Sequence, residues 1–150
     1  MKRAYIEWDT RFKIGIPLID KQHERLVQLT NNLYLACLDG RERAHEHFIE
    51  TAKEVVNYIN YHFTTEEKMM LLFEYPGYPD HRIEHQRFVK DVLAQIQSFS
   101  TQKNLAPNRF IQFLKEWILS HIAVNDKATA EYILSLKNND KLQILFPKPA

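Results

Sequence analysis

Four stretches of the sequence repeat apolar residues at alternating spacings of four and three. They are residues 18–38, 43–73, 80–100 and 107–136. This rhythm places the repeated side chains on one face of an α-helix, and that face has to pack against another element. Four such helices joined by short connections predict an all-α fold, an up-down-up-down four-helix bundle.

The segments between these stretches contain residues that end helices. Asp39-Gly40 follows the first stretch, a run with two prolines at 75–80 follows the second, and polar residues 101–106 follow the third. Proline lacks the amide hydrogen and restricts the residue before it, so the chain is expected to turn there. Residues 1–17 have no clear period and are expected to form an extended N-terminal arm across the bundle. Residues 137–150 are expected to form an irregular tail.

The composition is typical of one soluble globular domain over residues 1–150. The chain is 45% hydrophobic and 26% charged with a net charge of +1. A near-neutral charge argues against nucleic-acid binding, which needs clustered basic residues. The longest strongly apolar run, Met69 to Phe73, is too short to span a bilayer, and the first ten residues lack an apolar leader. With Cys37 as the single cysteine, no intramolecular disulfide can form, and we expect a cytoplasmic protein.

Polar residues occupy core positions on all four predicted helices, where leucine or isoleucine is usual. They are His23, His62, Glu66, His81, His85, His121 and Asp126. Residues four apart lie about 40° apart around a helix, so His62 with Glu66 and His81 with His85 each share a face. The distances of these residues from the helix ends predict that they lie at one depth. The sequence therefore predicts a polar layer inside the bundle.

A buried imidazole or carboxylate without a partner costs several kcal/mol, so something must satisfy this layer. Nitrogen and oxygen donors from four helices suit first-row transition metals, and their number suggests two ions. For two six-coordinate irons, five imidazoles, two bridging carboxylates and a bridging oxo or hydroxo group leave a single open position. One zinc ion would leave donors unused, and calcium or magnesium would prefer oxygen. The alternative is a polar layer that is hydrogen-bonded within itself.

One spacing does not suit a regular helix. His121 and Asp126 are five residues apart, which is about 140° of rotation in an α-helix. We therefore expect a π-type widening of the fourth helix near Ala123, which would bring both side chains to one face.

These motifs together resemble the hemerythrin family, in its bacterial single-domain form. The resemblance rests on HxxxE at 62–66, HxxxH at 81–85, HxxxxD at 121–126 and the isolated His23. Trp8-Asp9 and the run from Ile19 to His23 are similar to further signatures of the family. The resemblance covers about residues 8 to 132.

The resemblance implies a role for each of these residues. His81, His85 and His121 would hold a coordinatively full iron, His23 and His62 would hold the iron that binds dioxygen, and Glu66 and Asp126 would bridge the two. An apolar pocket around the open iron is implied at Leu26, Phe63, Trp117, Ile118 and Ile122. From residue type alone, Trp117 suits a bundle core as well as a pocket.

The implied function is reversible binding of dioxygen as hydroperoxide, for storage, delivery or sensing. The alternative is a di-iron enzyme, such as a peroxidase, an oxidase or a nitric oxide reductase. Oxygen-activating di-iron bundles usually have carboxylate-rich sites, so five imidazoles favour binding over catalysis. A sensory module acting on a separate protein partner is a third possibility, and the sequence does not identify such a partner.

Overall fold

The computed structural model describes residues 4–38, 44–101, 107–136 and 139–146. Within them the long helices are α1 (Pro17–Cys37), α2 (Ala44–Leu72), α3 (Tyr78–Thr101) and α4 (Pro107–Ser120). A π-helical segment, η2 (His121–Asp126), continues α4 directly into α5 (Lys127–Leu134), so α4, η2 and α5 form one rod.

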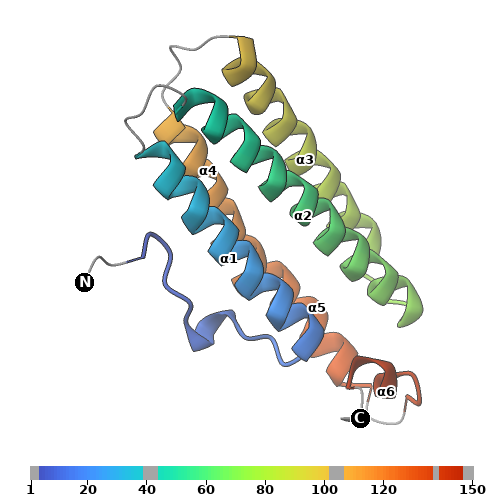
Figure 1. Cartoon of the computed structure of the whole chain (residues 1–150). Coiled ribbons are helices and arrows are strands. Elements are labelled where there is room, and N and C mark those ends of the chain that lie inside the picture. Colours follow the sequence, from blue (N-terminus) through green and yellow to red (C-terminus); the bar gives the residue numbers. More distant parts are fainter. Residues whose placement is uncertain (1–3, 39–43, 102–106, 137–138, 147–150) are drawn as a thin grey trace.

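The rods lie side by side and alternate in direction (Figure 1). Helix α1 packs on α2 and α4, and α2 packs on α3. This confirms the predicted all-α bundle. The predicted rhythm is followed closely along α2 and the residue after it. The stripe that the spacing of four and three predicts is buried throughout: Phe48, Ala52, Val55, Ile59, His62, Glu66, Met69 and Phe73. No helix among the described residues is long and apolar enough to cross a membrane.

The N-terminal arm runs along the bundle beside α1 (Figure 1). The side chain of Asn31 on α1 accepts from the Ile6 amide at 2.8 Å and donates to the Ile6 carbonyl at 2.9 Å. The arm is not wholly extended, because Thr10–Phe12 forms a 3-10 turn, η1, which packs against η2. Residues 1–3 of the predicted arm lie outside the described residues.

Helix α1 begins at Pro17, whose missing amide hydrogen costs nothing in a first turn. Asp20, in that first turn, accepts from the amides of Ile14 at 2.7 Å and Gly15 at 3.3 Å. Asp20 thus fixes the junction between the arm and α1.

The buried apolar residues form two clusters. The larger core contains Leu26, Phe63, Phe88, Ile118 and Ile122 among others. The smaller core contains Ile14, Ile16, Ile19, Met69, Phe73, Ala130, Ile133 and Leu145. On each rod that supplies both cores, a predicted polar residue falls between them in sequence: His23 between Ile19 and Leu26, Glu66 between Phe63 and Met69, and Asp126 between Ile122 and Ala130. His62 and His121 each lie one residue before the last larger-core residue of their rod. The polar layer therefore separates the two cores.

The C-terminal segment is more ordered than expected. Instead of an irregular tail throughout, it contains α6 (Leu142–Leu145), and Leu145 is buried in the smaller core. Lys141 beside this helix donates to the Leu72 carbonyl at 3.3 Å. Cys37 is half-buried, and its thiol donates to Asn108 Oδ1 at 3.1 Å. The predicted turn at Asp39-Gly40 and the connection at 102–106 lie outside the described residues.

Candidate metal centre

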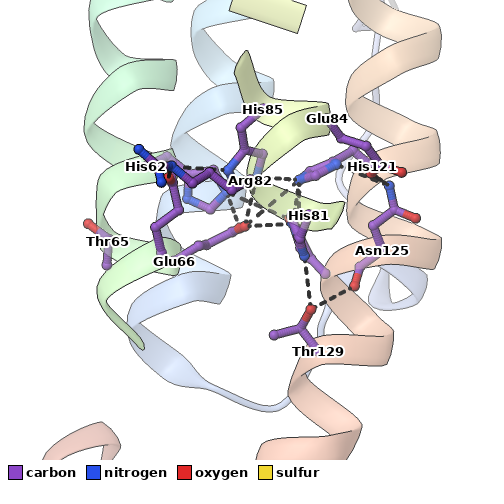
Figure 2. A network of polar contacts seen from close by, with 12 residues as sticks. His62, Thr65, Glu66, His81, Arg82, Glu84, His85, His121, Asn125 and Thr129 are labelled. Atoms are coloured by element: carbon purple, nitrogen blue, oxygen red, sulfur yellow. Dashed lines mark hydrogen bonds and ion pairs between the residues drawn. The ribbon is translucent and has the colours of Figure 1, made fainter. Parts of the chain in front are cut away.

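The structure brings the predicted polar residues together in one buried cluster. His23 comes from α1, His62 and Glu66 from α2, His81 and His85 from α3, and His121 and Asp126 from η2. Each is at most 5% exposed. Figure 2 shows several of these side chains pointing toward one another from neighbouring helices.

His23 and His62 form one half of the cluster, which we call the two-histidine half. Their Nε2 atoms lie 3.1 Å apart. Asp126 Oδ2 lies 2.8 Å from His23 Nε2, and Glu66 Oε1 lies 2.5 Å from His62 Nε2. Both ring nitrogens therefore face the same pair of carboxylates.

His81, His85 and His121 form the other half, the three-histidine half. His121 Nε2 lies 3.2 Å from His81 Nε2 and 3.0 Å from His85 Nε2. Asp126 Oδ1 lies 3.1 Å from His81 Nε2 and 2.8 Å from His121 Nε2. Glu66 Oε2 lies 3.4 Å from both His81 Nε2 and His85 Nε2.

Glu66 and Asp126 each present one oxygen to either half. The cluster thus forms two groups, one of five residues and one of four, and the ligand atoms of each group lie within 4.8 Å of one another. Both groups contain these two carboxylates. This is the geometry expected of carboxylates that bridge two cations. The two halves differ by one imidazole.

The π-helical segment explains how His121 and Asp126 reach the same cluster. The expected widening near Ala123 is confirmed, because residues 121–126 form a π-helix within an otherwise α-helical rod. The spacing of four and three residues in the stretch 107–136 predicts that Val124 lies on the core stripe with Leu114, Trp117 and His121. This prediction is wrong, because Val124 is 62% exposed. The wider turn rotates Val124 to the surface and Asp126 inward.

Three imidazoles have acceptors behind them, on the side away from the cluster. Gln22 Oε1 lies 2.7 Å from His62 Nδ1, and Glu67 Oε2 lies 3.3 Å from His85 Nδ1. Thr129 Oγ1, 3.1 Å from His81 Nδ1, donates its own hydrogen to the Asn125 carbonyl. Because these oxygens accept, each Nδ1 carries a hydrogen, and each Nε2 can present a lone pair to a cation.

The remaining two imidazoles differ from these three. His121 Nδ1 lies 3.3 Å from Asn125 Nδ2, which donates to Glu84 Oε2 at 2.6 Å (Figure 2). His23 Nδ1 is buried without a hydrogen-bond partner in the part of the chain that the structure describes. Sequence reasoning did not find the outer partners. Their position in the sequence could have indicated them, because Gln22, Glu67 and Asn125 are each next to a candidate ligand in the chain.

The carboxylates and imidazoles shift one another's proton affinities. Burial opposes a charge on His23, His81 and His121, but the nearby Asp126 and Glu66 carboxylates outweigh it and raise each pKa to about 9. Burial likewise opposes the charges of Glu66 and Asp126, and the surrounding imidazoles nevertheless hold the pKa of each well below its usual range. In the metal-free chain, protons therefore stabilise these anions, and a cation would replace them.

The polar contacts within the cluster fit a bound cation better than a self-contained hydrogen-bond network. One nitrogen, His121 Nε2, faces two other ring nitrogens and a carboxylate oxygen, and it can donate only one hydrogen. Glu66 Oε2 and Asp126 Oδ1 are buried beside imidazole nitrogens, but none of these close contacts has the geometry of a hydrogen bond. Positive ions between these donors would satisfy all of them at once, and imidazole with carboxylate suits a first-row transition metal.

The residues predicted to form an apolar pocket lie on the larger-core side of the polar layer. Leu26, Phe63, Ile118 and Ile122 are buried, and Trp117 is partly buried. The aromatic members pack on the three-histidine half: Phe63 stacks on His85 at 3.7 Å between ring centroids, and Trp117 stacks on His121 at 4.3 Å. A role for these five residues around an open metal position stays a prediction.

Comparisons with known proteins agree with this geometry. Residues 14–133 match the family described as "Hemerythrin HHE cation binding domain". The chain is 30% identical to a bacteriohemerythrin of Stenotrophomonas maltophilia, over 87% of this chain and 82% of that protein. It is 32% identical to a bacteriohemerythrin of Aquifex aeolicus, over 81% and 92% respectively. A crystal structure of wild-type hemerythrin superposes with a TM-score of 0.79 at 21% identity, covering 87% of this chain and 98% of that one.

A helical bundle with a buried cluster of imidazoles and shared carboxylates defines a class of cation-binding proteins. The family match covers most of the chain and includes all seven residues of the cluster. The chain belongs to the hemerythrin family.

Proposed function

We propose that this protein binds dioxygen reversibly at a pair of iron ions, for storage, delivery or sensing. His81, His85 and His121 would hold one iron, His23 and His62 the other, and Glu66 and Asp126 both. The observation that supports this most directly is the unequal number of donors around two shared carboxylates. The two-histidine half has one donor fewer, so the open position belongs there.

When bound, a ferrous pair supplies the electrons that reversible dioxygen binding requires. The chain's own contribution is to hold the pair and to exclude water. Leu26, Ile118 and Ile122 are each at most 2% exposed and lie in the apolar core next to the cluster. An apolar surrounding slows the loss of a bound anionic ligand, because protons and water cannot reach it.

The donor set favours binding over catalysis. Oxygen-activating di-iron bundles are typically rich in carboxylates, because anionic oxygen donors stabilise high oxidation states. Here imidazoles outnumber carboxylates in the group of five residues and equal them in the group of four. A di-iron peroxidase, oxidase or nitric oxide reductase is the alternative that the experiment must separate.

The test is anaerobic reconstitution of the full chain with ferrous iron, followed by elemental analysis and visible spectra. We expect two irons per chain and an absorption band that appears with oxygen and disappears when oxygen is removed. His121→Ala should bind less iron, because it removes a nitrogen from the three-histidine half. Steady turnover of added hydrogen peroxide or nitric oxide would support the enzyme instead, and failure to load two irons would contradict the proposal.

A further inference from the structure

Glu67 directly follows Glu66 on α2 but contacts the cluster from outside. Its Oε2 lies 3.3 Å from His85 Nδ1, the ring nitrogen that faces away from the cluster. Its Oε1 lies 3.6 Å from Arg82 Nε on α3. The side chain is 24% exposed, whereas that of His85 is 2% exposed. Glu67 therefore links a buried imidazole to the protein surface.

His85 differs from the other imidazoles in the charge of its direct partner. The partner of His62 is the amide oxygen of Gln22, and the partner of His81 is the hydroxyl of Thr129, and both are neutral. Among the described residues, Glu67 is the carboxylate that touches the outer nitrogen of a candidate ligand. Glu84 approaches His121 only through the amide of Asn125.

The His85 ring is held on two sides. Phe63 stacks on it with an interplanar angle of 4°, and the Glu67 carboxylate accepts from its edge. An imidazole that donates Nδ1–H to a carboxylate is fixed in orientation and is a stronger electron donor at Nε2. Because His85 is almost fully buried, little solvent lies between this negative charge and the cluster.

We propose that Glu67 is a positioning residue that acts through His85. It orients Nε2 toward the cluster and stabilises the more highly charged state of the cation held by the three-histidine half. This inference rests on the proposed metal pair, and it assigns a role to a residue outside the ligand set. Arg82 opposes the effect, because its positive charge lies on the other carboxylate oxygen.

The experiment compares Glu67→Gln with Glu84→Gln in the iron-loaded full chain. Both substitutions remove one negative charge beside the three-histidine half, but only the first changes a direct contact with an imidazole. The measurements are the midpoint potential of the iron pair and the rate of iron loss to a chelator. For Glu67→Gln we expect a higher potential and about tenfold weaker iron retention, since outer partners of this kind typically contribute 10- to 100-fold. For Glu84→Gln we expect a smaller change in both.

Arg82→Gln provides a second measurement that does not threaten folding, because the Arg82 side chain is 52% exposed. Removing its charge should lower the midpoint potential, which is the opposite sign to Glu67→Gln. Equal potentials in wild type and Glu67→Gln, or equal shifts in Glu67→Gln and Glu84→Gln, would overturn the proposal. If the wild-type chain fails to load two irons, the proposed function fails instead, so the two failures are distinguishable.

Discussion

The two halves of the cluster share both carboxylates but differ in how their imidazoles are supported. In the three-histidine half every outer nitrogen has a polar neighbour, and two rings carry stacked aromatics, Phe63 and Trp117. In the two-histidine half His62 has Gln22 behind it, and His23 Nδ1 has no partner in the described chain.

The asymmetry of the site originates in the number of imidazoles that each helix supplies. Helix α3 supplies two imidazoles to one half, whereas α1 supplies one to the other. The half with more donors is also the better supported, so it should hold its cation more tightly. In the proposed metal pair, the half with fewer donors would offer the free position that a small ligand needs.

The largest effect is expected from Asp126→Ala. The Asp126 carboxylate faces both halves, with Oδ2 2.8 Å from His23 Nε2 and Oδ1 2.8 Å from His121 Nε2. Its loss should therefore remove iron from both halves. Elemental analysis should find well under one iron per chain. In the metal-free protein, breaking these buried ion pairs should lower the free energy of unfolding by about 3–5 kcal/mol. Two irons retained in this variant would remove Asp126 from the ligand set.

Single histidine substitutions should separate the halves. His23→Ala leaves its half three residues that offer ligand atoms, whereas His85→Ala leaves four in the other half. We expect His23→Ala to bind about one iron, and His85→Ala to bind less than wild type but more than His23→Ala. Iron content after gel filtration, at matched protein concentration, measures the difference. Equal loss in both variants would show that the donor count does not govern retention.

Outer partners should have a smaller effect. Gln22→Ala removes the acceptor behind His62 and should weaken iron binding in the two-histidine half about tenfold. Thr129→Val is the matched change in the three-histidine half, and it should matter less because more donors remain there. Chelator competition monitors both. A larger loss of iron affinity in Thr129→Val than in Gln22→Ala would contradict the expectation that the three-histidine half holds its cation more tightly.

The smallest effect is expected from Val124→Asn. Val124 is 62% exposed because the π-helical turn rotates it outward, so the substitution should change the free energy of unfolding by no more than about 0.5 kcal/mol. In a regular α-helix this position would lie on the core stripe, and the same change would cost several times more. Chemical denaturation of the metal-free protein distinguishes the two cases.

The fold follows from the sequence wherever local periodicity and tertiary packing agree. The stripe from Phe48 to Phe73 is buried throughout because α2 is uninterrupted. Periodicity assumes a constant turn, so it misplaced Val124 just where the helix widens, although the spacing of His121 and Asp126 predicted the widening itself. Helix α6 was missed because it is only four residues long and depends on burying Leu145 against distant residues.

The cluster could be predicted because polar residues on a core stripe are costly and therefore conspicuous. Its outer partners could not be predicted in the same way. Gln22 is buried, but Glu67 and Asn125 are partly exposed, and such polar residues are common on any helix surface. The sequence does not indicate that Glu67 contacts the outer nitrogen of His85 while its neighbour Glu66 points into the cluster.

The polar layer also bears on how the chain resists unfolding. Its contacts join His23 to Asp126, 103 positions apart, and Glu66 to both His62 and His81. With one cysteine, the sequence has no intramolecular covalent tether of its own. Ions bound by these side chains would cross-link distant parts of the chain, close long loops and reduce the conformational entropy of the unfolded chain. Loading and folding would then be two aspects of a single equilibrium.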